Sequence, residues 1–398
     1  MKYLFSILHF TCCKAEENPV EFDEFGIQNE KLRLIQDTAR GGAISYISLA
    51  GSERNLVNNA DEGRYIQQSY YAGNSVDRQE EGQSPHWSPW TWNPIQCGDY
   101  ARNRAQILET RQTADSTYVK CIPMQWDMDG MYAEAEMEQW TSLDGNVVSV
   151  RCRLTCRRTD DIYGENIPRD QEIPAVYPIS ALNNLYSYFG DAPFTGAAIV
   201  NTEVIQLESG FWGRYTPGNG NFPSEKWMAF VDDNGWGLGV YSPQATEFLA
   251  GRSGYAGGES TSFWTGYIAP LRVEALMKNS VTEYSYYLVV GTLDEIRAKI
   301  YEIHHSFPTS NTTVNKEEKN DLKIYPNPAN AQIQITNCEL RKGDTIEIFD
   351  LEGKLQKSVS MSNNQSAFDL DISSLHQGMY FVSVNSAERT AAAYFIKE

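Results

Sequence analysis

Short stretches in which apolar and polar residues alternate recur from about residue 27 to residue 290. Examples are "AISYISL" (43–49), "NVVSVRCRL" (146–154) and "EYSYYLVVG" (283–291), and glycine, proline or Asp-Gly pairs separate such runs. The residues 292–307, "TLDEIRAKIYEIHHSF", instead predict a helix with three isoleucines on one face. Because many strands occur without alternating helices, we expect an all-β fold: a large antiparallel two-sheet supersandwich followed by a small β-sandwich.

One hairpin can be worked out in detail, because Asp144-Gly145 lies between two alternating runs. A two-residue turn at these positions pairs Glu138 with Arg151. One face of the hairpin is then apolar, and the other carries a ladder of opposite charges. We therefore interpret the glutamates of this strand as ion-pair partners rather than as a catalytic cluster.

Composition changes abruptly near residue 308. The stretch "PTSNTTVNKEEKND" is polar and lacks a periodic apolar pattern, which is typical of a linker. Alternating runs resume after it and continue to the C-terminus. We expect a signal peptide at 1–15, a large β-sandwich domain at 20–307, a linker at 308–321 and a second domain at 322–398.

The second domain contains the motifs "YPNPA", "IEIFDLEGK", "LDISSLHQGMYFVSV" and "YFIKE" in this order. In these motifs it resembles the type A C-terminal sorting domain of the type IX secretion system. The resemblance implies an immunoglobulin-like β-sandwich, a source in the Bacteroidota, and transport across the outer membrane by the type IX secretion machinery. The expected location is extracellular or the outer-membrane surface.

The N-terminal sequence "MKYLFSILHFTCCKA" has a lysine, a short apolar stretch and small residues, which is typical of a signal peptide. Cys12 and Cys13 leave a lipoprotein signal as the weaker alternative. No run reaches the roughly 18 apolar residues of a membrane-spanning helix. We therefore expect export and no transmembrane segment.

The net charge of −19 argues against binding to nucleic acid, since an acidic chain without a basic stripe repels phosphates. After the leader, five cysteines remain without CxxC spacing, which favours buried free thiols over a zinc site or a disulfide framework. Histidine is scarce, and the nucleophile-elbow, HExxH and nucleotide-binding motifs are missing. We expect no metal and no cofactor.

Carboxylates, amides, arginines and aromatic rings instead form dense blocks in the large domain. The first is "DEGRYIQQSYYAG" (61–73), and a second, "HWSPWTWNPIQCGD" (86–99), has three tryptophans among prolines that exclude a central strand. From these blocks and from the loop around Trp212, the candidate binding residues are Arg64, Gln67, Gln68, Tyr70, Tyr71, His86, Trp87, Trp90, Trp92 and Trp212.

A third block, "PRDQEIPAVYP" (168–178), supplies the main catalytic candidates. In an extended strand Asp170 and Glu172 share one face, where mutual repulsion can raise the pKa of one carboxyl group. A raised pKa suits a general acid beside a carboxylate base or nucleophile. Asp61, Glu62 and Asp99 are the alternative carboxylate partners. A surface turn that leads into a buried strand is the competing interpretation of this block.

Aromatic rings beside hydrogen-bonding side chains are typical of sugar binding, because rings stack on pyranose C–H faces and polar groups bond the hydroxyls. The large domain also loosely resembles galactose mutarotase-like supersandwiches, a fold shared by many glycan-active proteins. We expect a secreted or surface-attached protein that cleaves a polysaccharide or oligosaccharide as a glycoside hydrolase. A lyase, with Tyr70 or Tyr71 as base and Arg64 or Arg102 neutralising a uronate, is the less favoured variant. A non-catalytic glycan-binding protein or adhesin is the alternative.

Overall fold

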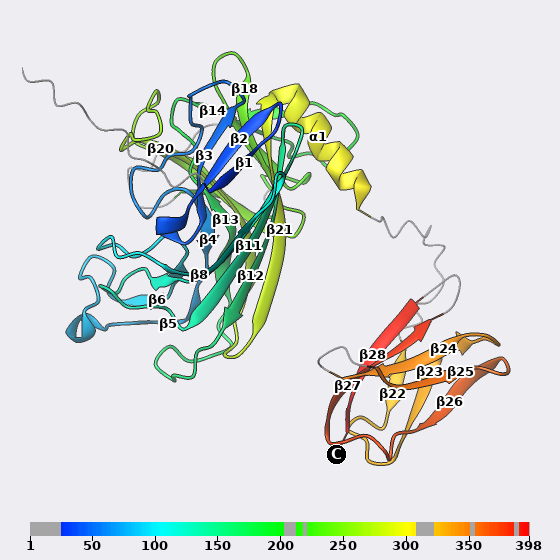
Figure 1. Cartoon of the computed structure of the whole chain (residues 1–398). Helices are drawn as coiled ribbons and strands as arrows, with labels where there is room; N and C mark the ends of the chain where they lie inside the picture. The colour runs from blue at the N-terminus through cyan, green and yellow to red at the C-terminus, as the bar shows by residue number, and fades with distance from the viewer. Residues whose placement is uncertain are drawn as a thin grey trace, which may run out of the picture. The chain divides into compact units, whose positions relative to one another are not determined.

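The computed structural model describes residues 25–202, 212–217, 221–307, 322–350, 355–385 and 390–397. The chain divides into two compact units, Met1–Phe307 and Pro308–Glu398. Both units are built from antiparallel strands, with one α-helix among the described residues (Figure 1). The all-β fold predicted from the alternating pattern is confirmed. The expected leader (1–15) and linker (308–321) lie outside the described residues.

The first sheet of the larger unit has ten described strands. It contains the strands that position the candidate site. Their order is β1 (Gly26–Gln28), β2 (Leu32–Asp37), β3 (Ala43–Leu49), β4 (Ile66–Ser69), β13 (Arg169–Val176), β20 (Thr265–Glu274), β19 (Glu247–Ser253) and β16 (Gly213–Tyr215), while β7 (Pro94–Ile95) pairs with β4 and with β10 (Met124–Gln125).

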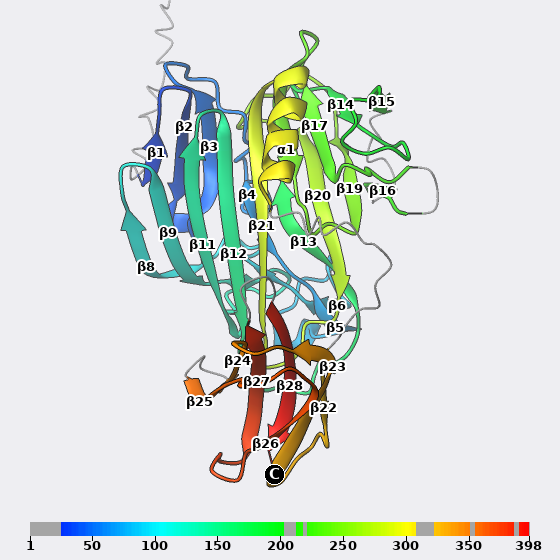
Figure 2. The same ribbon diagram turned by 90° about the vertical axis from the view of Figure 1, so that its right-hand side faces the viewer.

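The second sheet has nine described strands and forms the other layer of the sandwich, as Figure 2 shows. A separate two-stranded ribbon, β5 (Ala72–Val76) with β6 (Trp90–Trp92), and two 3₁₀ turns, Thr38–Arg40 and Gln79–Glu81, complete the connections. The order of the second sheet is β15 (Val200–Thr202), β14 (Asn184–Ser187), β17 (Trp227–Val231), β18 (Trp236–Tyr241), β21 (Val281–Thr292), β12 (Val147–Cys156), β11 (Ala135–Asp144), β9 (Ser116–Ile122) and β8 (Gln106–Gln112).

The core lies between the two sheets and contains inward-facing residues of both. Ile44 and Ile66 of the first sheet are buried in the same cluster as Val148, Val150 and Leu288 of the second. This burial follows the period of two along each strand. Cys97, Cys121, Cys152 and Cys156 are buried free thiols, as the sequence predicted.

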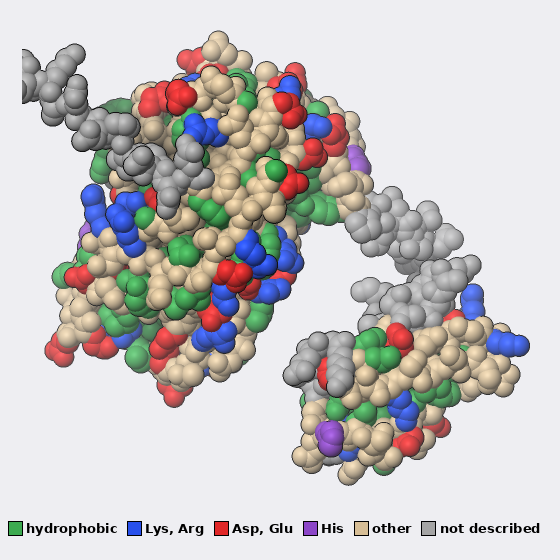
Figure 3. Space-filling model, in the orientation of Figure 1, with side chains coloured by type: hydrophobic (Ala, Val, Ile, Leu, Met, Phe, Trp, Pro, Cys, Tyr) green, Lys and Arg blue, Asp and Glu red, His purple; other side chains and the backbone are tan. Residues whose placement is uncertain are grey.

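The β11–β12 hairpin forms, but its register differs from the predicted one. Asp144 pairs with Val147, so the two turn residues are Gly145 and Asn146, and Glu138 faces Arg153 instead of Arg151. Because the register moves by two residues, the face of every side chain is preserved. The ladder of opposite charges is present, with Glu138 bonded to Arg153 and Glu136 to Lys120 and Arg157. Acidic and basic side chains are interspersed on the face drawn in Figure 3.

Helix α1 (Leu293–Ser306) packs on the outer face of the second sheet. Thr292 and Glu295 form a capping box at its start, and Ile296 and Ile300 are buried against the sheet. Glu225 anchors the helix: its carboxylate accepts hydrogen bonds from Arg297 at 2.9 Å and from Tyr301 at 2.5 Å. Among the described residues, no helix is long and apolar enough to cross a membrane.

The smaller unit is a sandwich of two described sheets with its own apolar core, which includes Ile333, Ile348, Val382 and Phe395. Alternate residues of its strands supply that core, as the sequence pattern predicted. One sheet has the order β22 (Lys323–Tyr325), β23 (Gln332–Leu340) and β26 (Gln365–Asp371); the other has the order β25 (Leu355–Ser360), β24 (Thr345–Phe349), β27 (Gly378–Asn385) and β28 (Thr390–Lys397).

Candidate functional site

A bulge in β13 determines which side chains face the candidate site. Glu172 pairs with Leu271 of β20, whereas Val176 pairs with Ile268, so β13 contains one additional residue between these positions. The bulge includes Pro174, which cannot donate a ladder hydrogen bond and is therefore tolerated there. The additional residue reverses the alternation, and Glu172 and Tyr177 consequently line the same pocket.

This pocket has a volume of about 110 Å³ and lies over β4 and β13 of the first sheet. Five of its twelve lining residues are aromatic, and the others include amide groups and one carboxyl group. The lining residues are Gly63, Gln67, Ser69, Tyr71, Trp87, Trp90, Asn93, Ile95, Trp126, Glu172, Ala175 and Tyr177.

Four aromatic rings form one wall of the pocket through successive edge-to-face contacts. The ring centroid of Trp87 lies 5.3 Å from that of Trp90 and 5.7 Å from that of Trp126. The ring centroids of Tyr71 and Trp90 are 6.4 Å apart. The Trp90 indole N–H donates to Asn93 at 3.1 Å, and Asn93 donates in turn to the backbone carbonyl of Tyr70. These bonds fix the Trp90 indole, against which Trp87 and Tyr71 pack, so this part of the wall is preorganised for a ligand.

Glu172 is the acidic group of the pocket. Its side chain is buried, and the Tyr267 hydroxyl donates a hydrogen bond to its Oε1. Burial raises the pKa of Glu172, although hydrogen bonds from Ser69, Tyr267 and Tyr71 oppose part of this effect. Glu172 therefore has the environment of a carboxylic acid that retains its proton above the usual range.

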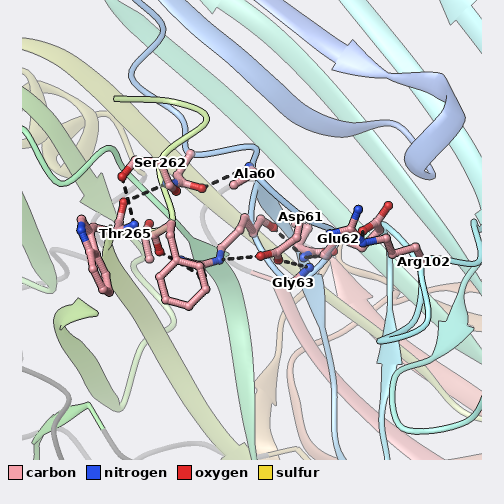
Figure 4. A network of polar contacts seen from close by, with 12 residues as sticks. Ala60, Asp61, Glu62, Gly63, Arg102, Ser262 and Thr265 are labelled. Atoms are coloured by element: carbon pink, nitrogen blue, oxygen red, sulfur yellow. Dashed lines mark hydrogen bonds and ion pairs between the residues drawn. The ribbon is translucent and has the colours of Figure 1, made fainter. Parts of the chain in front are cut away.

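An Asp61–Arg64 pair lies beside the pocket. Asp61 accepts hydrogen bonds from the Gly63 amide at 2.9 Å and from Arg64 Nε at 3.3 Å, and Figure 4 shows this network. The Arg64 guanidinium carbon lies 5.8 Å from the ring centre of Tyr177, which lines the pocket.

Tyr65 has φ = +72°, a strained conformation for a bulky residue. It buries its own ring against Ala43 and Cys97.

The structure brings several of the predicted residues to this pocket. Gln67 lines the pocket, and its amide donates hydrogen bonds to the backbone carbonyls of Glu62 and Arg64. These bonds hold the segment that precedes β4. Trp212 stacks on Tyr267 with centroids 4.5 Å apart, directly behind the tyrosine that bonds Glu172. The predicted residues found at or beside the pocket are Asp61, Arg64, Gln67, Tyr71, Trp87, Trp90, Glu172 and Trp212.

Three predicted binding residues are buried in the core or between the strands. Trp92 is 1% exposed, with Arg158 over its ring at 5.2 Å. Tyr70 is buried and its hydroxyl donates to Gln68 Oε1 at 2.8 Å, while the Gln68 amide bonds the carbonyl of Glu138. The polar atoms of Tyr70 and Gln68 are engaged internally and Trp92 belongs to the core, so these side chains support the fold rather than the pocket.

Other predicted residues are occupied elsewhere. Asp99 is buried and accepts from the backbone amides of Ala101, Asn103 and Gly130, so it organises its own loop.

Glu62 pairs with Arg40 at 3.1 Å. Asp170 is bound by Arg214 at 2.6 Å and does not line the pocket with Glu172. His86 is exposed, with its ring edge-to-face on Trp87 at 5.2 Å. Among these, His86 alone borders the aromatic wall.

The sequence interpretation missed Trp126, Tyr177 and Tyr267. Trp126 precedes an Asp-Met-Asp-Gly turn, and Tyr177 lies at the end of the "IPAVYP" run, so both had local signals of an irregular, exposed position. Tyr267 is buried within β20, and nothing in its neighbourhood distinguishes it from a core residue. Among the described residues, no group of three His, Cys, Asp or Glu side chains could hold a metal ion.

Comparison with known proteins identifies the smaller unit. Residues 323–398 match the family described as the secretion system C-terminal sorting domain. This match confirms the resemblance recognised in the sequence and implies export to the cell surface or the medium. No curated protein matches the chain in sequence.

Several solved structures are similar to parts of this chain at low identity and low TM-score. A galactose mutarotase related enzyme from Lactobacillus acidophilus is 9% identical, with a TM-score of 0.43 over 68% of this chain and 98% of its own. A galactose mutarotase-like protein from Lactobacillus casei is 9% identical, with a TM-score of 0.39 over 67% and 99%. A polysaccharide lyase is 12% identical, with a TM-score of 0.34, over 93% of this chain and 47% of its own. The chemistry of the site is therefore inferred from this chain's own residues.

Proposed function

We propose that this protein is an exported glycan-cleaving enzyme in which Glu172 is the general acid. The observation that carries the proposal is a buried carboxyl group of raised pKa beneath a wall of indole rings. Such a wall suits the C–H face of a sugar, and a protonated carboxyl group can protonate the leaving glycosidic oxygen. The sorting domain supports this proposal, because it implies export to the cell surface or the medium, where an enzyme can encounter polysaccharides.

In this mechanism, sugar rings stack on Trp87 and Trp90, while Gln67 and Asn93, whose amides are bonded within the fold, hold the pocket lining in place. Glu172 transfers its proton to the glycosidic oxygen as the C–O bond breaks. Asp61, at the rim, is the proposed second carboxylate, acting on the anomeric carbon directly or through water. Arg64 orients Asp61 through its Nε bond.

The lyase variant is less well supported by the pocket. Burial and the neighbouring Glu172 raise the pKa of Tyr71 well above the usual value, so its hydroxyl stays protonated and cannot take a proton from the substrate. Tyr70 is buried in the core, and Arg102 pairs with Glu62 at 3.9 Å, although its side chain is largely exposed. A hydrolytic reaction through Glu172 is the better match.

A non-catalytic glycan-binding protein is the second candidate. It is favoured by one observation: Glu172 is the single carboxyl group among the described lining residues. A binding protein requires only the aromatic wall, and it has no need of a proton donor.

The assay that separates these candidates is incubation of the purified protein with a panel of polysaccharides. New reducing ends without unsaturated sugars would support the hydrolase, and unsaturated products would instead identify a lyase. Retention of a polysaccharide without any product, at every pH tested, would establish the binding protein and contradict the proposed enzyme.

The same proposal includes a signal peptide at 1–15 for export across the inner membrane. It also includes final residence at the outer-membrane surface or outside the cell. Mass spectrometry of the mature N-terminus and cell fractionation test them.

A further inference from the structure

The larger unit exposes two aromatic rings beside the candidate site. Phe263 is 68% exposed and Tyr255 is 69% exposed. Trp264 lies between them, with centroid distances of 5.0 Å to Phe263 and 5.4 Å to Tyr255. Apolar rings exposed to this extent in a cluster commonly mark a binding surface rather than chance exposure. We call Tyr255, Phe263 and Trp264 the distal aromatic cluster.

The distal aromatic cluster is continuous with the pocket through Arg64. The Arg64 guanidinium carbon lies 5.8 Å from the ring centre of Tyr177, which lines the pocket, and 5.9 Å from that of Phe263. Arg64 Nη2 also donates to the backbone carbonyl of Phe263 at 3.4 Å. Two steps of just under 6 Å therefore connect the pocket lining to the first exposed ring.

The backbone that presents Phe263 is held on both sides. The Asn58 side-chain amide donates to the carbonyl of Ser262 at 2.9 Å and to that of Trp264 at 3.0 Å. Ser262 Oγ accepts a hydrogen bond from the Trp264 amide at 3.0 Å, and Ser262 is labelled in Figure 4. The backbone at Phe263 is consequently fixed with the ring exposed to solvent. A ligand that stacks on this ring therefore binds with little loss of conformational entropy in the loop.

A glycine is required for this arrangement. Gly254 has φ = +76°, and a Cβ at this position would lie 1.7 Å from Cε3 of Trp264. The close approach lets the Trp264 indole pack flat on the backbone, and it places the ring beside Phe263 and Tyr255. The cluster is therefore built into the turn and does not depend on side-chain rotamers alone.

The size of the pocket shows why additional binding surface is needed. Its volume of about 110 Å³ is well below the roughly 300–1,000 Å³ of pockets that enclose a whole small ligand. The pocket therefore accommodates only part of its ligand, and the remainder extends over the surrounding surface. Arg64 and the distal aromatic cluster provide a surface suited to sugar faces at that exit.

We propose that the distal aromatic cluster is a remote subsite for a glycan chain of several sugars, which extends from the pocket across Arg64 to Phe263. This inference rests on the proposed glycan-binding function of the pocket. It specifies the substrate class as a polymer rather than a mono- or disaccharide. Remote binding of this kind supplies affinity that a small pocket alone lacks.

The test compares full-length wild type with Phe263→Ala and with the double variant Phe263→Ala/Tyr255→Ala. Binding is measured by calorimetry on a length series of oligosaccharides made from the polysaccharide that the wild type retains. Tyr325→Ala, which removes an exposed tyrosine of the smaller unit, is the matched control. Circular dichroism and thermal unfolding confirm that each variant is folded.

We expect Phe263→Ala to weaken binding of the long chains about tenfold, to leave the shortest bound oligosaccharide unchanged, and to exceed any effect of the control. Equal losses at every length, or no loss at any length, would overturn the remote subsite. Wild type that binds chains in this length-dependent manner without cleaving them would support the subsite and contradict only the enzyme. Wild type that retains no polysaccharide would overturn both.

Discussion

The hydroxyl of Tyr267 donates a hydrogen bond to Oε1 of Glu172, and both side chains are buried beside the aromatic wall. Tyr267 in turn stacks on Trp212 with ring centroids 4.5 Å apart and contacts the tilted ring of Tyr177 at 4.8 Å, and both contacts restrain its position. The hydrogen bond from Tyr267 lowers the pKa of Glu172, whereas burial raises it, because a hydrogen bond to the charged carboxylate favours ionisation. Tyr267 is therefore a positioning residue that adjusts the proton affinity of Glu172.

Tyr267→Phe should raise the pKa of Glu172 further, because the bond that lowers it is lost. Since the reaction requires the protonated acid, the alkaline limb of the profile of kcat/KM against pH should move to higher pH. A pH profile of both proteins on the same polysaccharide measures this. A limb that moves to lower pH would contradict the assigned contact.

Glu172 should also make stability depend on pH. Its folded pKa lies above the usual value of 4.5. The stability due to the protonated group is therefore complete below pH 4.5 and is lost as the pH rises through the folded pKa. Glu172→Gln cannot ionise, so the free energy of unfolding of the wild type relative to this variant should fall as the pH rises from 4.5. Denaturant unfolding of both proteins at a series of pH values measures this difference in the free energy of unfolding. A difference that does not change with pH would contradict the buried environment of Glu172.

Trp87→Ala and Trp92→Ala should have opposite consequences. Trp87 lines the pocket, so its removal should weaken glycan binding about tenfold with a smaller change in stability. Trp92 is buried in the core, so its removal should lower the free energy of unfolding by about 3–5 kcal/mol. Calorimetric binding and chemical unfolding of both variants measure the contrast. Equal effects of the two substitutions on binding would argue against the assigned wall.

Arg297→Met should destabilise the larger unit without changing the site. Burial alone would raise the pKa of Glu225, but bonds from Arg297, Tyr301 and Trp227 lower it, so the carboxylate is charged and fully buried. Removing its cationic partner should cost about 3–5 kcal/mol in the free energy of unfolding. Thermal unfolding measures the loss, and glycan binding below the transition is the control. An unchanged transition would show that Glu225 does not depend on Arg297.

The sequence predicted the strands and the helix because these depend on local patterns. It predicted the hairpin but shifted its register, since Asp144-Gly145 is the stronger turn signal, whereas the chain turns at Gly145 and Asn146. The faces remained correct because the shift was even.

The site was only partly predictable, for a physical reason. Alternation places Trp90 and Trp92 on one side, but Trp92 is buried while Trp90 lines the pocket, and the β5–β6 pairing is irregular there. The bulge in β13 similarly reorients Tyr177 toward Glu172. The partners of Glu172 lie on β20, on β4 and just after β4, and contacts between segments distant in sequence leave no periodic signal along the chain.

The most direct test of the central claim is the effect of Glu172→Gln on cleavage and on binding, measured on one polysaccharide from the panel. The amide preserves the shape of the side chain but cannot donate a proton to the leaving oxygen. We predict that kcat falls about 10²- to 10⁴-fold while the dissociation constant of the chain changes less than about threefold. Full residual cleavage by this variant would contradict the assignment of Glu172 as the general acid.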